Sequence, residues 1–264
     1  MKLGFIGTGN MATAIATKII SAGVVAATDI TGSCSSNLNA KKKTLELGFS
    51  VGSDNKAVVK ASDIIFLSCK PQQYAAVIAE ISGVVEPDQV VVTIAPGKTI
   101  AWLEDQFGKT VKIVRCMPNT PALVGEGFTS YCPNERVTKE ELSQVESLLD
   151  CFGTRMLLPE KLIDAASAVG GSAPAFVYAF IEALADGGVA EGLPRTAAYE
   201  VAAQTVLGSA KMVLESGKHP GILKDEVCSP GGSTIKGMEV LEKNAFRGTV
   251  IDAVRTTAAA ARKL

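Results

Sequence analysis

Histidine is almost absent from this chain of 264 residues, because His219 is the only one. Catalytic triads with an imidazole base, and metal sites with several imidazole ligands, need histidines that this sequence does not have. We therefore expect no histidine-based catalysis and no metal site. His219 precedes Pro220 and is expected to be a surface turn residue.

A charge excess of one sign is also missing. The 26 basic and 27 acidic residues give a formal net charge of −1, so nothing electrostatic favours nucleic acid or an anionic membrane as a partner. The basic run Lys41–Lys43 is too short to change this. We expect it to be solvated, with the 2′-phosphate of a bound dinucleotide as the alternative contact.

Long apolar runs and paired cysteines are missing as well. No apolar stretch reaches the ~20 residues that a membrane span needs, and Gly7 and Gly9 interrupt the apolar N-terminus that a signal peptide would need. The six cysteines show no C-x-x-C pair and no metal-ligand spacing, which is typical of reduced thiols. These absences predict a cytoplasmic protein without a membrane partner.

The most informative stretch that is present lies at the N-terminus, where the apolar run Lys2–Ile6 is followed by a glycine-rich turn and a helical pattern. This order is the dinucleotide-binding fingerprint, with alanine at the third glycine position. Gly7 allows the tight turn, Gly9 has no Cβ to keep a pyrophosphate away, and Ala12 lets the helix pack closely on its strand. We expect cofactor contacts, rather than a merely structural turn, at Gly7, Thr8, Gly9, Asn10, Met11 and Ala12.

The first 160 residues alternate short apolar runs with amphipathic patterns such as Asn37–Leu47, Gln72–Ile81 and Ile100–Phe107. Continuous apolar runs are typical of parallel strands that helices bury on both faces. The sequence therefore predicts an α/β fold with a Rossmann-type, doubly wound, mostly parallel sheet. The predicted strands are Lys2–Ile6, Asp29–Ser33, Ser50–Val51, Asp63–Ser68, Gln89–Ile94 and Val111–Cys116. Gly127–Tyr131 and Thr154–Leu158 flank a charged helix, Lys139–Asp150, and should extend the sheet edge, with antiparallel pairing as one option.

After Pro159 the strand patterns end and helical spacing continues to the C-terminus. We expect residues 1–160 to form the dinucleotide-binding domain and residues 161–264 an all-α dimerisation and substrate domain, joined by a short hinge at Glu160–Asp164. The helical half is too apolar to stand alone, so a second copy is expected to cover it. The expected helices include Thr196–Glu215, Pro220–Val227, Ser233–Glu242 and Thr249–Lys263.

Small hydroxyl and thiol side chains end the second predicted strand, at Ser33, Cys34 and Ser35. An NAD site usually carries an acid there for the ribose 2′-hydroxyl, whereas a missing carboxylate leaves room for a 2′-phosphate. The segment therefore favours NADPH, with NADH as the other cofactor. The alternative is a solvated loop in an enzyme that uses either.

Three further turns follow predicted strands. Lys70, in Ser68–Pro71, could donate to a ribose hydroxyl or carboxamide, or be a solvated lysine. Ala95–Gly97 is small enough to let the nicotinamide ribose approach the backbone, and Asn119, between two prolines, could hold an amide near the nicotinamide or only stiffen a turn.

One stretch of the helical half also carries a site pattern: Pro-Gly-Gly-Ser-Thr at Pro230–Thr234. Backbone N–H groups and two hydroxyls at a helix start suit a small carboxylate. A plain helix cap by Ser or Thr is the alternative, although two consecutive glycines exceed what capping needs.

The chain resembles the pyrroline-5-carboxylate reductase family from end to end. The resemblance rests on Gly4–Ala12, Cys69–Pro71, Val114–Gly127, Gly170–Phe176, Glu182–Arg195 and His219–Ile235. It implies NAD(P)H-dependent reduction of 1-pyrroline-5-carboxylate to L-proline, the last step of proline biosynthesis. It also implies a homodimer through the C-terminal helices, often assembled into decamers.

The resemblance carries site residues onto matching positions. Cofactor contacts are implied at Gly7–Ala12, Ser33, Cys34, Ser35, Asn55, Ser68, Cys69, Lys70, Pro71, Ala95, Pro96 and Gly97, beside the Asn119 interpretation above. Substrate contacts are implied at Glu160, Asp225, Gly231, Gly232, Ser233 and Thr234. Thr234 would be the polar partner of the ring nitrogen, and Cys34 departs from the serine common in that loop.

A cyclic imine can enter the site already protonated, so orientation and electrostatics can supply most of the catalysis without a strong acid. The β-hydroxyacid dehydrogenases share the fingerprint but need a lysine base, which the run Gly170–Tyr178 lacks. An imine reductase for another cyclic imino acid, and an NADPH-binding regulatory protein, are the remaining alternatives.

Overall fold

The computed structural model describes residues 1–262, except for the side chain of Asn37. The chain divides into two compact units, residues 1–172 with the C-terminal residues from Thr257, and residues 173–256. This boundary lies later than the one expected after residue 160, because the helix that begins at Glu160 packs on the sheet. The end of the expected helix Thr249–Lys263, and of the expected domain 161–264, lies outside the described residues.

The first unit is built on one eight-stranded sheet with the order β3-β2-β1-β4-β5-β6-β7-β8. Its strands are β1 (Leu3–Ile6), β2 (Ile30–Ser33), β3 (Ser50–Gly52), β4 (Ile64–Leu67), β5 (Val90–Thr93), β6 (Lys112–Met117), β7 (Gly127–Pro133) and β8 (Gly153–Leu157). The first six are parallel, β7 runs antiparallel to β6, and β8 is parallel to β7. The doubly wound, mostly parallel sheet is confirmed, including an antiparallel pair near its edge.

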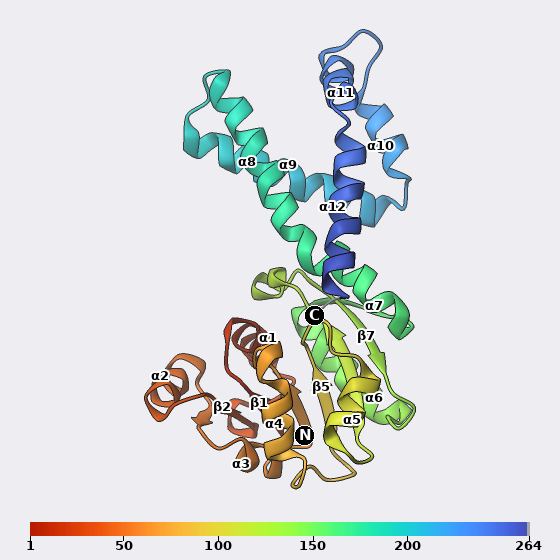
Figure 1. The fold of residues 1–264 in the computed structure, drawn as a ribbon. Coiled ribbons are helices and arrows are strands. Elements are labelled where there is room, and N and C mark those ends of the chain that lie inside the picture. Colours follow the sequence, from red (N-terminus) through yellow and green to blue (C-terminus); the bar gives the residue numbers. More distant parts are fainter. Residues whose placement is uncertain (263–264) are drawn as a thin grey trace. The chain divides into compact units, whose positions relative to one another are not determined.

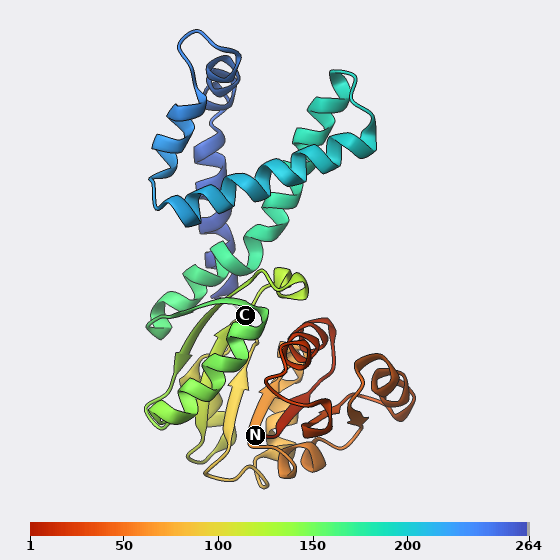
Figure 2. The ribbon, with the colours of Figure 1, turned by 180° about the vertical axis from the view of Figure 1, so that it is seen from behind.

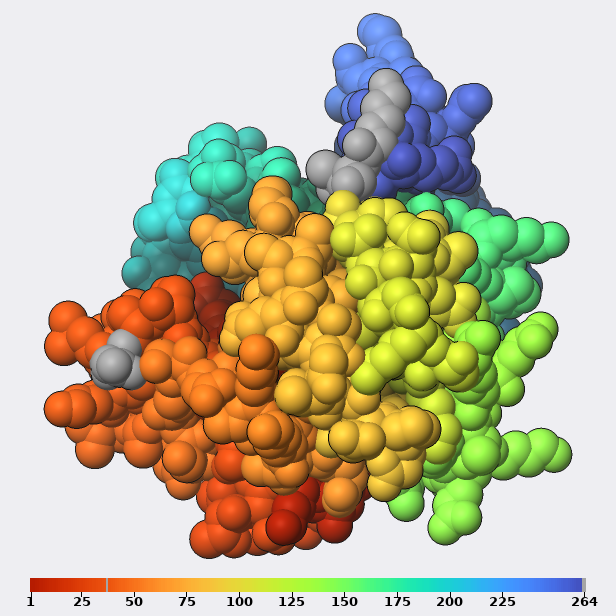
Figure 3. All heavy atoms as spheres, turned by 60° about the horizontal axis from the view of Figure 1, so that its bottom comes forward, coloured from red at the N-terminus to blue at the C-terminus, as the bar shows by residue number. Residues whose placement is uncertain are grey.

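Helices cover both faces of this sheet, which explains why its strands are continuous apolar runs. The helices are α1 (Asn10–Ser21), α2 (Asn37–Leu47), α3 (Asn55–Lys60), α4 (Tyr74–Ile81), α5 (Ile100–Phe107), α6 (Lys139–Leu149) and α7 (Glu160–Ser167). Figure 1 shows α4 and α5 in front of the sheet, and Figure 2 shows α1 and the green α6 on the other face. In Figure 3, the orange and yellow side chains of the α4 and α5 region form a continuous layer.

Successive residues of each strand contribute to two separate cores. In β1, Phe5 packs with the α1 and α6 side chains, while its neighbour Ile6 packs with those of α3, α4 and α5. Phe66 and Leu67 of β4 divide in the same way. Because β1 pairs in parallel with both β2 and β4, the carboxyl ends of these three strands lie at one edge of the sheet, where a doubly wound fold binds its ligand.

The expected hinge at Glu160–Asp164 is wrong, because these residues form the first turns of α7. The helix continues through a π-helical segment, Ala168–Ser172, into α8 (Ala173–Ala190). The helical stretch Glu160–Ala190 has 31 residues and contains an 18-residue window with a mean hydropathy of 1.4, so by length and composition it could cross a membrane. This corrects the expectation that no apolar stretch reaches that length: alanines and glycines keep the hydropathy high between scattered charges.

The second unit is helical. It contains α8, α9 (Arg195–Ser216), α10 (Pro220–Val227), α11 (Ser233–Lys243) and the start of α12 (Phe246–Ala261). Its buried cluster consists of Ala185, Ala198 and Ala202, while large apolar side chains such as Tyr178 and Leu207 are exposed. A surface of this kind is typical of a subunit interface.

Candidate functional site

A cavity of about 530 Å³ lies at the carboxyl ends of β1, β2 and β4. Eight of its lining residues were expected to contact the cofactor: Gly7, Thr8, Gly9, Cys34, Ser35, Ser68, Cys69 and Lys70. Lys42 and Lys43, for which the 2′-phosphate was the alternative expectation, also line it, whereas three others were not expected: Asn39, Glu46 and Gln73. Since α2 begins directly after the loop Cys34–Ser36, the polar residues on its first turns could have been expected there.

The glycine turn after β1 meets two different steric demands. Gly7 has φ +91°, and a Cβ there would lie 2.6 Å from the Cys69 nitrogen, so packing alone requires glycine. A Cβ on Gly9 would have no atom within 4 Å, yet Gly9 lines the cavity. The second glycine therefore keeps space open that the fold itself does not use, and this fits a bound pyrophosphate better than a structural turn.

The N-terminus of α1 has backbone donors to offer to an anion. Gly9 is its N-cap and no side chain caps it among the described residues. Ala12 is buried in the core beside β1, as expected for the third position of the fingerprint. The buried Thr8 hydroxyl also has no hydrogen-bond partner within the described chain. The uncapped N–H groups and the helix dipole suit a phosphate.

A smaller cavity of about 160 Å³ shares five lining residues with the first, and among the residues that it adds are Ser33 and Asn55. The shared residues are Gly7, Cys34, Ser35, Cys69 and Gln73. The Ser33 hydroxyl donates to Asn55 Oδ1 (2.6 Å), so these two expected residues are adjacent. The Asn55 amide in turn donates to Glu80 (2.8 Å).

The charges around the larger cavity favour an anion. Lys42, Lys43 and Lys70 line it with one carboxylate, Glu46, whose partner is Lys43 at 3.0 Å. Lys42 and Lys43 therefore lie where the alternative expectation, a contact with the 2′-phosphate, would place them, and that contact stays a prediction. Burial raises the pKa of the Cys69 thiol to about 11, so this lining residue is a neutral thiol at physiological pH.

The remaining expected cofactor residues lie outside both cavity linings: Asn10, Met11, Ala12, Pro71, Ala95, Pro96, Gly97 and Asn119. Asn119 is only 7% exposed, and its amide donates to the Gly170 carbonyl (2.8 Å) and accepts from the Phe128 N–H (2.9 Å). Both ends of the amide are thus used within the protein. These contacts are what the structural turn requires, and the place of Asn119 near the nicotinamide stays a prediction.

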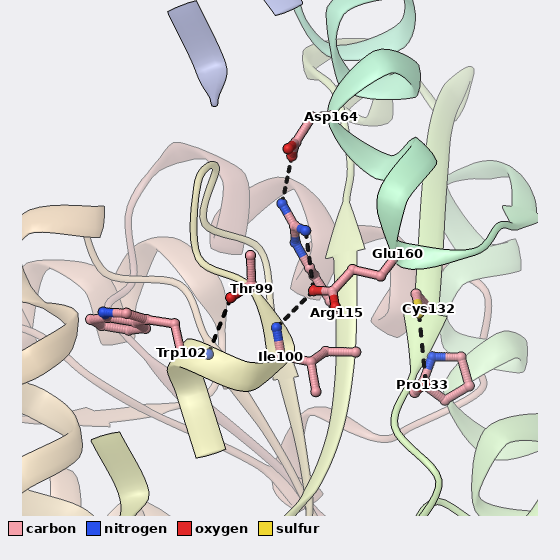
Figure 4. Close-up of polar contacts among 8 residues, drawn as sticks. All are labelled: Thr99, Ile100, Trp102, Arg115, Cys132, Pro133, Glu160 and Asp164. Atoms are coloured by element: carbon pink, nitrogen blue, oxygen red, sulfur yellow. Dashed lines mark hydrogen bonds and ion pairs between the residues drawn. The ribbon is translucent and has the colours of Figure 1, made fainter. Parts of the chain in front are cut away.

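A buried ion-pair network lies beside the loop that follows β5 (Figure 4). Arg115 of β6 donates to Glu160 (3.2 Å) and to Asp164 (2.7 Å), both on α7. Glu160 Oε1 also accepts the Ile100 N–H at the start of α5 (2.7 Å). A substrate contact at Glu160 stays a prediction, whereas its structural contacts are visible. Arg115 was missed, although an arginine inside an apolar strand is a signal of a paired buried charge.

The start of α11 contradicts the capping interpretation of Pro230–Thr234, while the carboxylate site there stays a prediction. The N-cap is Gly232, and no side chain caps the helix in the described part of the chain, so Ser233 and Thr234 are not capping residues. A Cβ on Gly232 would lie 2.4 Å from the Ser229 hydroxyl, and Gly231 has φ +69°. The positive φ favours glycine at Gly231, whereas the nearest neighbour of Gly232 is a side-chain hydroxyl that can rotate away. No side chain of the described chain occupies the first N–H groups of the helix. Asp225, on α10, is exposed and ion-paired with Lys224.

Comparison with known proteins agrees with both halves of this description. Residues 160–264 match the family model for pyrroline-5-carboxylate reductase dimerisation, and residues 2–97 match a model described as NADP oxidoreductase, coenzyme F420-dependent. The chain is 45% identical over 253 residues to pyrroline-5-carboxylate reductase of Escherichia coli (strain K12), covering 96% of this chain and 94% of that protein. The chain belongs to the pyrroline-5-carboxylate reductase family.

Other pyrroline-5-carboxylate reductases support this membership. The enzyme of Arabidopsis thaliana is 41% identical, over 100% of this chain and 95% of its own length. The crystal structure of the Plasmodium falciparum enzyme with NADP bound is 35% identical with a TM-score of 0.91, covering 100% of this chain and 97% of that one.

Both candidate sites of this reductase fall inside the matched segments. The glycine turn lies within residues 2–97, and Gly231–Thr234 lie within the dimerisation segment. That segment begins at residue 160, where the sequence analysis placed the domain boundary, although contacts divide the chain later. Among residues 1–262, no group of three or more His, Cys, Asp or Glu side chains could hold a metal ion.

Proposed function

We propose that this chain reduces 1-pyrroline-5-carboxylate to L-proline with NADPH, as the last step of proline biosynthesis. The observation that carries the proposal is the start of α11, where no described side chain caps the helix and the hydroxyls of Ser233 and Thr234 directly follow two glycines. Family membership supports the same reaction.

The cofactor half of the proposal rests on the cavity beside β1, β2 and β4. Gly7–Ala12 would hold the pyrophosphate at the start of α1, and Ser33, Cys34, Ser35 and Asn55 would face the ribose. Lys42 and Lys43 would add positive charge for the 2′-phosphate, which supports NADPH over NADH. When bound, NADPH supplies the hydride. We extend the cofactor contacts to Ser68–Pro71 and to the loop Ala95–Gly97.

The substrate half rests on α11 and its surroundings. The N–H groups of Gly231, Ser233 and Thr234 would bind the substrate carboxylate, and the helix dipole would add to the attraction. The Gly232 N–H donates to the Ser229 carbonyl (3.0 Å). The Thr234 hydroxyl would contact the ring nitrogen and so fix which carbon receives the hydride. Asp225 and Glu160 complete the proposed substrate residues.

Proton balance explains why so few acid–base residues are needed. Reduction of a C=N bond adds a hydride to carbon and a proton to nitrogen. If the imine enters as its conjugate acid, the nitrogen already carries that proton. The protein then has to orient the ring and stabilise its charges, which positioned hydroxyl and N–H groups can do.

We also propose a cytoplasmic homodimer through residues 161–264, assembled further into a decamer, with no nucleic-acid or membrane partner. Exposed Tyr178, Leu184 and Leu207 on α8 and α9 support burial against a second copy. Light scattering coupled to gel filtration in the absence of detergent measures this assembly. A monomer at micromolar concentration would contradict it.

The decisive assay follows the oxidation of NADPH in the presence of 1-pyrroline-5-carboxylate, and is then repeated with NADH in place of NADPH. We expect rapid oxidation with this imine and a preference for NADPH. Oxidation only with a six-membered cyclic imino acid would favour a related imine reductase. NADPH binding without turnover of any cyclic imine would favour a regulatory protein.

A further inference from the structure

Arg115 is the largest fully buried side chain among the described residues, with 1% of its surface exposed. Burying a guanidinium is costly unless charged partners surround it. Both partners come from α7, where Glu160 and Asp164 are one helical turn apart and face β6 together (Figure 4). The Arg115 Nε has no partner in the described chain, so these two carboxylates carry the compensation.

The two carboxylates differ in what else they contact. Asp164 Oδ1 meets Arg115, whereas Glu160 Oε1 meets both Arg115 and the Ile100 N–H. Ile100 is the first residue of α5, and its N-cap Thr99 accepts a bond from the Trp102 N–H (3.1 Å). The first turn of α5 is therefore held by its own cap and, from outside, by Glu160.

The Ile100 contact fixes one end of the loop that joins β5 to α5. The other end is β5, which is fully buried between β4 and β6. Between them lies Ala95–Gly97, where Gly97 has φ +74°. A short loop fixed at both ends has fewer accessible conformations, and a preorganised loop binds a ligand more tightly because less ordering is needed on binding.

We propose that Arg115 is a positioning residue. Its guanidinium orients Glu160 so that Oε1 holds the Ile100 amide, and this contact sets the Ala95–Gly97 loop for the nicotinamide end of the cofactor. The inference rests on the proposed cofactor site, but its first test needs neither cofactor nor substrate.

The test compares Glu160→Ala, Glu160→Gln and the matched control Asp164→Ala in the full-length protein. Hydrogen exchange, resolved at the Ile100 amide without cofactor, measures the contact directly. NADPH affinity is measured separately by fluorescence in the absence of imine. Glu160→Ala should speed exchange at Ile100 about tenfold and weaken NADPH about three- to tenfold. Glu160→Gln keeps an acceptor oxygen, so its exchange rate at Ile100 and its NADPH affinity should be close to those of the unchanged protein.

Asp164→Ala removes an ion pair from the same arginine but leaves the Ile100 acceptor. It should lower the melting temperature without changing NADPH affinity. Equal weakening of NADPH by Asp164→Ala and Glu160→Ala would show that the ion pairs between Arg115 and α7 act only through stability, and would overturn the proposal. Unchanged exchange and affinity in Glu160→Ala would also overturn it. If imine turnover were absent while both effects appeared, the proposed reaction would fail and the positioning role would stand.

Discussion

Gly7 lies directly against Cys69: a β-carbon on Gly7 would be 2.6 Å from the Cys69 nitrogen and 2.7 Å from its α-carbon. The turns after β1 and β4 are thus packed backbone to backbone. The Ser68 hydroxyl reinforces the contact by donating to the Gly7 carbonyl (2.7 Å). Gly9, two residues later, has no such neighbour. Substitutions at the two glycines can therefore distinguish a role in packing from a role in binding.

Gly7→Ala should lower the free energy of unfolding by ~2 kcal/mol or more, because the new methyl meets fixed backbone and φ is positive. Gly9→Ala should leave thermal stability nearly unchanged, since its φ of −78° suits alanine, but weaken NADPH about tenfold. Thermal melts and NADPH titrations distinguish the two. Normal NADPH affinity in Gly9→Ala would contradict binding of the pyrophosphate at this turn.

The preference for NADPH should depend on Lys42. We expect Lys42→Ala to weaken NADPH roughly fivefold and NADH hardly at all, because only NADPH carries the 2′-phosphate. The matched control is Lys41→Ala, since Lys41 is exposed and is not part of the cavity lining. The difference should shrink as salt is added. An equal loss of affinity for NADPH and for NADH would contradict a contact between Lys42 and the 2′-phosphate.

The fold was predictable because its signals are local and consistent. Apolar runs such as Ile64–Leu67 end in glycine, proline or serine, and helix caps such as Thr99 precede amphipathic segments. Expected and observed bounds agree for α2, α5 and α10. The short helix α3 was not foreseen, because six residues are too few for a periodic pattern.

The parts of the site that were missed depend on contacts distant in sequence. Arg115 and Glu160 are 45 residues apart, and no local pattern shows that they meet. For the same reason Glu160–Asp164 was interpreted as a hinge, although the pairing with Arg115 requires an ordered helix there. Asn119 was ambiguous because an amide between prolines has the same sequence whether it binds a ligand or the Gly170 carbonyl.

Alkaline pH should destabilise the protein through Cys69. Burial raises the pKa of its thiol to about 11, above that of an unfolded thiol, so the folded state favours the neutral form. The stability that the neutral Cys69 thiol contributes is complete below the pKa of the thiol in the unfolded chain. It is lost as the pH rises toward the pKa of the thiol in the folded protein. Denaturant titrations should therefore show stability falling between about pH 9 and about pH 11.

Cys69→Ser should reduce this alkaline loss, because a serine hydroxyl does not titrate in that range. Burial also raises the pKa of Tyr74, so part of the loss should remain in the variant. Peptide mapping after iodoacetamide treatment offers an independent measurement. Cys69 should be labelled slowly until about pH 10, and rapid labelling at neutral pH in the folded protein would contradict the raised pKa.

Thr234 tests the proposed chemistry most directly, because the structure gives its hydroxyl no capping duty that a mutation would disturb. Thr234→Ala should lower kcat/KM for 1-pyrroline-5-carboxylate roughly tenfold, the loss of one hydrogen bond to a charged partner. Thr234→Ser keeps the hydroxyl and should retain most of the activity, while NADPH affinity should be unchanged in both variants. If Thr234→Ala had normal kcat/KM, the ring nitrogen would need another partner. The carboxylate would then be the substrate group left for the start of α11 to bind.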